Sequence, residues 1–167
     1  MQNKKVFFLT RAALIAAVYV VLTLVFAPIS FGQIQVRIAE ALTILPVFTS
    51  AAVPGLFIGC LLGNIFGGAI LTDIVFGSIA TLIGALGTYY IGKFAKESAS
   101  MPFLAALPPI VANVIAVPLI LRYAYGVDLP LIFLMATIGM GEFLSCGVLG
   151  VGLYYLLRKR KNIFVYS

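Results

Sequence analysis

The chain has 167 residues, of which 63% are hydrophobic and 10% charged, and its formal net charge is +6. A soluble domain of this length cannot hide so much apolar surface, so lipid must cover it. The sequence contains no His, which excludes catalysis by imidazole and any metal site that needs histidine. We therefore expect neither a metal nor a cofactor. Its basic residues gather near apolar runs, which fits an anionic membrane face better than nucleic acid.

The first predicted span runs from about Ala12 to Pro28, after a basic N-terminal segment. It resembles a signal peptide but lacks a convincing small-x-small cleavage site, so we interpret it as an uncleaved first helix. Residues 29–35 contain Gly and Gln and are expected to form an outer loop or a re-entrant cap. Arg37 and Glu40 follow, three residues apart, so they would share one face of a helix and can pair.

The run 41–72 has no charged residue and is too long for one comfortable span of about 20 residues. Prolines and a glycine interrupt it, so we divide it into spans of about Ala41–Ala52 and Pro54–Leu71. These short spans imply local bilayer thinning or deep packing in the bundle. Asp73 then marks a predicted outer turn. Three further spans are predicted: Ile74–Gly92, Met101–Leu121 and Leu129–Leu157.

The distribution of basic residues supports six spans. With six spans both termini lie on one side, and that side holds most of the 11 basic residues: Lys4, Lys5, Arg11, Lys93, Lys96, Arg158, Lys159, Arg160 and Lys161. Only Arg37 and Arg122 lie on the other side, so the first side is cytoplasmic by the positive-inside rule. A single span over 41–72 would break that rule. We therefore predict an all-α, polytopic membrane protein with one transmembrane domain over 1–167, six helices and cytoplasmic termini.

Glu142 is the main candidate for a functional residue. It lies near the middle of the uncharged run 129–157, where a carboxylate costs roughly 2.5–3.5 kcal/mol on insertion scales. Such a residue usually faces a protein interior or a water-filled cavity. The alternative is a structural acid, either protonated or paired with Arg37. Asn113, midway in the fifth span, is a second candidate, although buried amides also hydrogen-bond across helices.

Small residues and cysteines are expected to pack. Cys60 and Cys146 lie in separate apolar runs and are predicted to be packing residues rather than a disulfide. A glycine stripe on the third span is expected to pack inside the bundle. It consists of Gly55, Gly59, Gly63 and Gly67. The first span carries two alanine pairs with a spacing of four: Ala12 with Ala16, and Ala13 with Ala17.

The stretch 33–46, with its Arg-x-x-Glu-Ala-Leu and Leu-Pro motifs, and the following Gly55–Cys60 are similar to the QueT family of queuosine-precursor transporters. The likeness extends over essentially the whole chain. Members of this family resemble the substrate-binding (S) components of energy-coupling-factor (ECF) transporters. The resemblance therefore implies a multi-pass protein of the cell (plasma) membrane with a six-helix bundle of the ECF S-component type.

The resemblance also implies a function and partners. An S component binds a vitamin-like solute at its outer face and docks onto a transmembrane coupling subunit (EcfT) and two ATPase subunits (EcfA and EcfA′). The family's inferred solutes are deazaguanine precursors of queuosine, such as the aminomethyl compound preQ1. The alanine face of the first helix contacts the coupling subunit in such proteins. In this chain that face would contain Ala12, Ala13, Ala16 and Ala17.

The residues are chemically compatible with a deazaguanine. The Glu142 carboxylate can accept both the ring N–H and the exocyclic amine of a guanine-type edge. Asn113 can satisfy the neighbouring carbonyl, and Glu40 or Asp73 can face an aminomethyl cation. Aromatic residues can stack on the ring; the candidates are Phe31, Tyr89 and Tyr123. The pair Arg37–Glu40 either contacts the ligand or anchors a cap over the pocket.

Other functions fit the sequence less well. An enzyme is not expected, because there is no His, no phosphate-binding Gly-x-x-x-x-Gly-Lys-Ser/Thr loop and no pair of acids at fixed spacing in one span. ATP hydrolysis would belong to the partner subunits. The alternatives are a stand-alone small-solute carrier and an S component for a different vitamin-like nitrogen heterocycle. A carrier would move solute by itself, whereas an S component would bind tightly but concentrate solute only with its ATPase module.

Overall fold

The computed structural model of the protein describes residues 2–30, 35–95 and 98–159. Within these ranges every regular element is helical, which confirms the predicted all-α class. The elements are α1 (Gln2–Val25), α2 (Ala27–Ser30), η1 (Ile38–Val47), α3 (Ala52–Phe66), α4 (Leu71–Phe94), α5 (Met101–Tyr123), α6 (Leu131–Glu142), η2 (Phe143–Gly150) and α7 (Val151–Arg158). Two of them are irregular, because η1 is a 3₁₀-helix and η2 is a π-helix.

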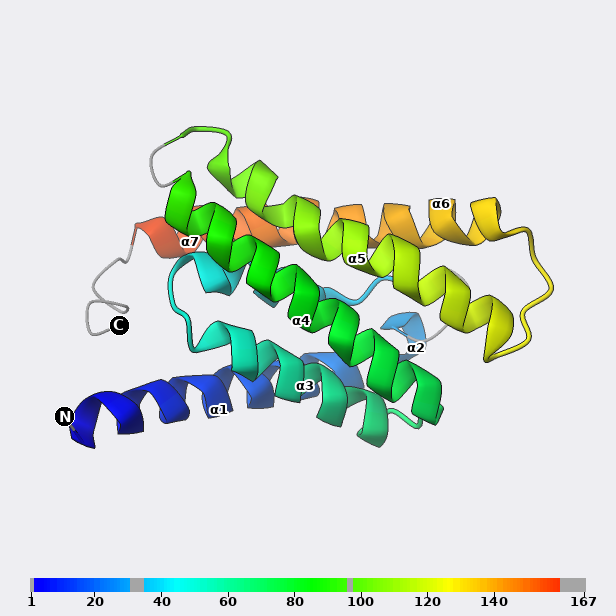
Figure 1. The fold of residues 1–167 in the computed structure, drawn as a ribbon, viewed down its shortest axis with the longest axis horizontal. Coiled ribbons are helices and arrows are strands. Elements are labelled where there is room, and N and C mark those ends of the chain that lie inside the picture. The colour runs from blue at the N-terminus through cyan, green and yellow to red at the C-terminus, as the bar shows by residue number, and fades with distance from the viewer. Residues whose placement is uncertain (1, 31–34, 96–97, 160–167) are drawn as a thin grey trace.

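The long helices lie side by side and run back and forth along the molecule (Figure 1). Four helical segments are long and apolar enough to cross a membrane: Lys4–Val25, Leu71–Phe94, Met101–Tyr123 and Leu131–Arg158. Between the first and second of these lie two shorter apolar helices, η1 and α3. The chain is therefore a multi-pass membrane protein. The count of six crossings stays a prediction, because η1 and α3 are both shorter than a typical span.

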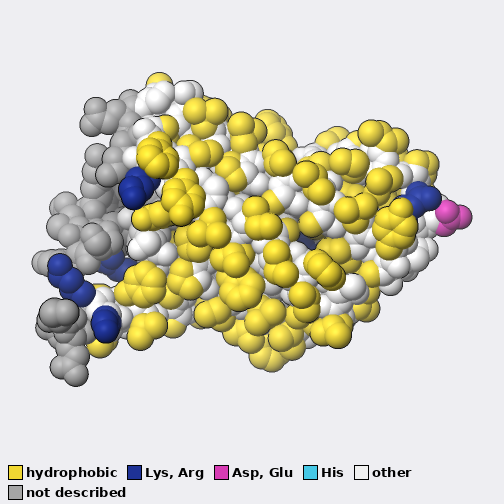
Figure 2. All heavy atoms as spheres, viewed as in Figure 1, with side chains coloured by type: hydrophobic (Ala, Val, Ile, Leu, Met, Phe, Trp, Pro, Cys, Tyr) yellow, Lys and Arg dark blue, Asp and Glu magenta, His cyan; other side chains and the backbone are white. Residues whose placement is uncertain are grey.

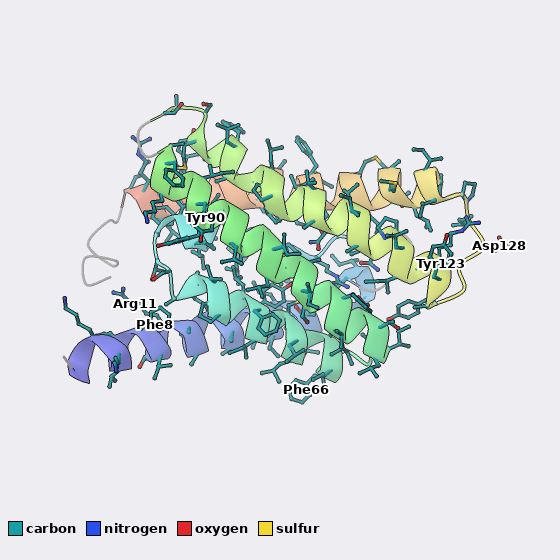
Figure 3. All side chains as sticks on the ribbon, viewed as in Figure 1. Phe8, Arg11, Phe66, Tyr90, Tyr123 and Asp128 are labelled. Atoms are coloured by element: carbon teal, nitrogen blue, oxygen red, sulfur yellow. The ribbon has the colours of Figure 1, made fainter. Side chains whose placement is uncertain are left out.

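The surface has the charge pattern of a membrane protein. Figure 2 shows hydrophobic side chains over the flank of the molecule, with Lys and Arg gathered at one end and a small group of charges at the other. Arg11 lies toward the first end and Asp128 at the opposite end (Figure 3). The start of α1 and the end of α7 share the first end (Figure 1). This arrangement agrees with the predicted charge asymmetry.

The prediction that the uncharged run 41–72 divides into two segments is confirmed. The first segment, η1, ends at Val47, and the second, α3, begins at Ala52. Pro46 lies inside η1 and lacks a backbone N–H, which weakens a regular α-helix at this point. A 3₁₀-helix rises about 2.0 Å per residue, so ten residues of η1 cover about 20 Å, more than the same residues would as an α-helix.

The glycine stripe of α3 packs against α1, which confirms its predicted role inside the bundle. A Cβ atom added at Gly59 would lie 2.8 Å from Tyr19 Cβ, and one at Gly55 would lie 2.8 Å from the Ala12 carbonyl oxygen. These glycines therefore allow a close backbone approach between the two helices. Consequently Ala12 and Ala16 are buried by α3 within the chain, and the expectation that they contact an external partner is corrected.

The other alanine pair has a different environment. Ala13 and Ala17 are exposed, because one residue along an α-helix rotates the side chain by about 100°. The exposed face of α1 also includes large apolar side chains such as Leu14 and Val18. Only Ala13 and Ala17 of the four predicted alanines are thus available for contact with another protein.

The two irregular helices pack against each other in the interior. Gly141 lies so close to the Gln35 carbonyl that no side chain fits there, and Gly150 lies against the backbone of Ala41. Arg37, at the N-terminus of η1, has an extended backbone with φ −88° and ψ 92°. Non-helical backbone at membrane depth is tolerated only where protein or water surrounds it. The buried segment from Gln35 to Arg37 meets that condition.

Candidate functional site

Polar side chains from six elements meet inside the bundle, in what we call the polar cluster. Its members are Tyr19 of α1, Glu40 and Thr43 of η1, Thr81 of α4, Asn113 of α5, Glu142 of α6 and Cys146 of η2. All of them are buried. Glu142 therefore faces the protein interior rather than lipid, as expected for an acid at this depth.

Glu40 lies at the centre of the polar cluster and is fully buried, with 0% exposure. Its Oε1 atom accepts hydrogen bonds from the Tyr19 hydroxyl and from the Thr81 hydroxyl, the latter at 3.4 Å. Its Oε2 atom has no hydrogen-bond partner among the described residues. One half of this carboxylate is thus satisfied by the protein, and the other half is available to a ligand.

Glu142 faces Glu40 across the cluster. The Cys146 thiol donates to Glu142 Oε2 at 3.4 Å, and the same thiol lies 3.5 Å from the Glu40 carbonyl oxygen. Thr43 donates to that carbonyl at 2.6 Å. Carboxylate oxygens of both glutamates and the Cys146 sulfur lie within 4.8 Å of one another. The pairing of η1 with η2 therefore brings together two acids that are about 100 residues apart in the sequence.

Asn113 lies beside Glu142 but is not fully used by the fold. The two side chains are close enough to interact. Nevertheless the Asn113 amide nitrogen, like the Ser145 hydroxyl oxygen, is buried without a hydrogen bond of ordinary geometry to any described residue. Buried polar atoms without partners are uncommon and destabilising. Glu40 Oε2, the Asn113 amide nitrogen and the Ser145 hydroxyl are therefore the atoms of this region that a ligand could satisfy.

The unpartnered groups define what the site can bind. Glu40 Oε2 requires a donor, whereas the Asn113 amide nitrogen requires an acceptor. The two carboxylates and the Cys146 sulfur lie close enough together to hold a metal ion, but a metal ion would leave the N–H groups of Asn113 without an acceptor. The arrangement therefore fits a small organic molecule that carries donors and an acceptor on neighbouring atoms.

A second group of polar residues lies near the start of α4, toward the end of the molecule that carries Asp128 (Figures 1 and 3). An ion pair joins Arg37 to Asp73 at 3.7 Å, and the Tyr125 hydroxyl donates to Asp73 Oδ2 at 3.2 Å. Burial raises the pKa of the Tyr125 phenol, which keeps this donor protonated. The Asn64 amide donates to the Asp73 carbonyl oxygen at 3.4 Å, so Asn64 serves packing and structure.

Two expectations about these residues are corrected. Asp73 does not lie in an outer turn but in the first turn of α4, where it is buried. Arg37 forms an ion pair with Asp73, and because its extended backbone precedes η1 it does not share a helical face with Glu40 as expected. The interpretation that Arg37 anchors a structural element fits this geometry better than direct ligand contact.

The predicted aromatic residues do not gather at the polar cluster. Tyr89 lines a surface cavity with Phe48 and Lys93, at the basic end of the molecule, and its contact with the ligand stays a prediction. Tyr123 is 77% exposed near the opposite end (Figure 3). Phe31 lies outside the described residues, and its role stays a prediction.

Four members of the cluster were not predicted as site residues: Tyr19, Thr43, Thr81 and Cys146. Tyr19 follows Ala16 by three residues, so it lies on the helical face that packs on α3. Cys146 follows Glu142 by four residues and shares its face. These spacings are the signals that point to them. Cys60 and Cys146 are both free and buried, as predicted, although Cys146 hydrogen-bonds as well as packs.

The fold and the cluster together define a multi-pass helical membrane protein with a buried polar cluster in its interior. A family model described as QueT transporter matches residues 9–159, and the chain belongs to this family. It is also similar to the queuosine precursor transporter QueT of Lactococcus lactis subsp. cremoris (strain MG1363), with 27% identity over 155 residues, covering 87% of this chain and 89% of the relative. No solved structure matches the chain significantly. The resemblance seen in the sequence is thus confirmed.

Proposed function

We propose that the protein is the substrate-binding component of an ECF-type importer in the plasma membrane, and that it captures a queuosine precursor such as preQ1 at the outer face. Membership of the QueT transporter family and the name of the Lactococcus relative support transport of this solute class. The observation that carries the proposal is the polar cluster, in which Glu40 presents an unused acceptor and Asn113 an unused donor beside the buried Glu142.

The chemistry of a deazaguanine matches these groups. Its ring N–H and exocyclic amine form a donor pair that one carboxylate accepts in a forked geometry, and Glu142 provides that carboxylate. The adjacent ring carbonyl accepts from the Asn113 amide. The aminomethyl cation then donates to Glu40 Oε2. A site that leaves buried polar groups unpaired without the right ligand discriminates strongly against analogues that lack those groups.

The proposal includes energising partners. The segment Gly87–Lys93 matches Gly-x-x-x-x-Gly-Lys, but Phe94 follows it in place of Ser or Thr and the whole segment lies inside helix α4, so it is not a phosphate-binding loop with which to use ATP. A coupling subunit and two ATPase subunits would drive uptake. The exposed Ala13 and Ala17 of α1 are the part of the predicted alanine face that remains available for docking. The bundle corresponds to the S-component fold in this proposal.

The primary test is calorimetric titration of the purified full-length chain with preQ1. We expect tight, saturable binding, and we expect Glu142→Gln to weaken it by at least about tenfold, since a charged acceptor of two hydrogen bonds is lost. Asp128→Asn is the matched control, because Asp128 is an exposed loop acid far from the cluster. No binding of preQ1 by the wild-type chain would refute the proposed solute.

Uptake into liposomes tests the transport class. The chain alone should bind preQ1 without concentrating it, and addition of the coupling and ATPase subunits with ATP should produce concentrative uptake. Rapid flux through the chain alone would instead identify a stand-alone carrier. Native mass spectrometry of the purified chain provides an independent identification of any solute that co-purifies.

A further inference from the structure

The polar cluster has an unbalanced charge. Glu40 and Glu142 are both buried, and their carboxylate oxygens lie within the 4.8 Å group that also contains the Cys146 sulfur. Two ionised carboxylates this close in a dry interior repel each other strongly, and such pairs usually retain one proton. The membrane setting increases the cost of uncompensated charge.

The surrounding elements do not neutralise both acids. The charged and titratable groups facing the pair are Tyr19 from α1, Arg37 before η1, Cys60 from α3, Asp73 from α4 and Cys146 from η2. Among them Arg37 is the one cation, and it forms an ion pair with Asp73. Its charge is therefore largely matched by Asp73. α5 contributes the neutral Asn113.

We propose that the ligand-free site holds one proton between Glu40 and Glu142, and that a cationic ligand displaces this proton when it binds. This inference rests on the proposed function and adds the charge class of the ligand. In the bound state the ligand's single positive charge replaces the proton, so the net charge of the site stays constant. The released proton passes to water, and the freed carboxylate accepts hydrogen bonds from the ligand.

The hydrogen bonds assign the proton to Glu142. Glu40 Oε1 accepts from two hydroxyl groups, those of Tyr19 and Thr81, and such bonds favour the ionised form. Glu142 accepts from the Cys146 thiol, which is a weak donor, and its other neighbour is the neutral amide of Asn113. Glu40 is thus the carboxylate of the empty site, and Glu142 is the carboxylic acid that ionises when the cation arrives.

Proton release has a defined pH dependence. Because the free protein binds one proton more than the complex, the affinity for a cationic ligand rises with pH. The rise is about tenfold per pH unit while Glu142 is protonated in the free protein and the ligand amine is charged. An uncharged ligand shows no such rise, since it has no charge to exchange for the proton.

Calorimetry of the full-length chain with preQ1, in buffers of equal pH but different ionisation enthalpy, tests this inference. We expect about one proton released per preQ1 bound near neutral pH, and none for an analogue with methyl in place of aminomethyl. Binding without proton release, or with proton uptake, would overturn the inference and leave the proposed function intact. Absence of preQ1 binding would overturn both.

Two further measurements test whether a proton is released and whether Glu142 is the residue that releases it. Infrared difference spectra of the wild-type chain should lose a carboxylic-acid carbonyl band when preQ1 is added, and an unchanged band would count against the inference. Glu142→Gln should bind preQ1 more weakly and without dependence on buffer, whereas Asp128→Asn should release the same proton as the wild type. If Glu142→Gln binds too weakly to titrate, the wild-type infrared and buffer experiments still decide.

Discussion

At the scale of single residues, the fold accepts buried polar atoms that do not contribute to its stability. The Asn113 amide nitrogen is such an atom, because it is buried without a partner of ordinary geometry. An unsatisfied buried donor costs about 1–3 kcal/mol. Its retention is understandable if the ligand supplies the missing acceptor, since functional sites commonly sacrifice stability in this way.

This argument predicts opposite effects for two asparagines. Asn113→Leu should leave the ligand-free protein equally stable or more stable, while weakening preQ1 binding by about tenfold or more. Asn64→Leu should instead destabilise the protein, because Asn64 donates to the Asp73 carbonyl oxygen. Thermal unfolding in detergent and calorimetry of the same samples measure both quantities. Lower stability of Asn113→Leu with unchanged affinity would contradict the assignment.

Sequence reasoning predicts the charged part of the site better than its hydroxyl and thiol parts. Glu142, Glu40 and Asn113 are conspicuous because acids and amides are expensive inside a membrane. Tyr19 and Thr81 are not conspicuous, because their hydroxyl groups cost little there and such residues also serve simple packing. Their role depends on which helical faces meet at Glu40, and this is a tertiary property.

At the scale of elements, contact between α1 and α3 depends on glycine. The added Cβ at Gly59 would overlap with both Tyr19 and Ala16. We therefore predict that Gly59→Leu separates the two helices and lowers stability by about 1–3 kcal/mol, as overpacking usually does. It should also weaken ligand binding, since Tyr19 would no longer hold Glu40.

Gly152→Leu is the control for this prediction, because no atom lies within 4 Å of a Cβ at Gly152. Thermal unfolding and preQ1 titration of the two variants provide the comparison. Equal stability of Gly59→Leu and Gly152→Leu would show that the close approach of α1 and α3 is not required.

The elements themselves follow largely from uncharged runs and their breaks. The division of 41–72 was predictable because prolines and a glycine interrupt an apolar run that is too long for one span. The 3₁₀ geometry of η1 and the π geometry of η2 were not predictable from these runs, since they arise from packing of the two segments against each other. The alanine spacing likewise leaves helical phase undetermined, so it could not separate the buried pair Ala12 and Ala16 from the exposed pair Ala13 and Ala17.

At the scale of the whole molecule, the charge asymmetry predicts orientation. The end that carries Lys4, Lys5, Lys93, Arg158 and Lys159 should face the cytoplasm. A reporter fused after Ser167 should therefore be active only in the cytoplasm, and an epitope inserted beside Asp128 should be accessible from outside intact cells. If the Asp128 epitope were cytoplasmic, the C-terminal fusion point would lie outside, because one predicted span separates the two. The number of crossings would then be odd, or the orientation of the whole bundle would be reversed.

Orientation and packing together determine how the molecule can meet a partner within the membrane. The side of α1 opposite α3 is exposed, and Ala13 and Ala17 let another helix approach more closely there than the surrounding large side chains do. Ala17→Trp should therefore reduce co-purification of the coupling subunit several-fold while leaving preQ1 affinity unchanged, because Ala17 does not touch the polar cluster. Ile115→Trp, on the exposed face of α5, is the control and should assemble normally. Equal assembly of both variants would show that the partner does not dock on this face of α1, whereas loss of preQ1 binding in Ala17→Trp would show that the substitution disturbs the bundle.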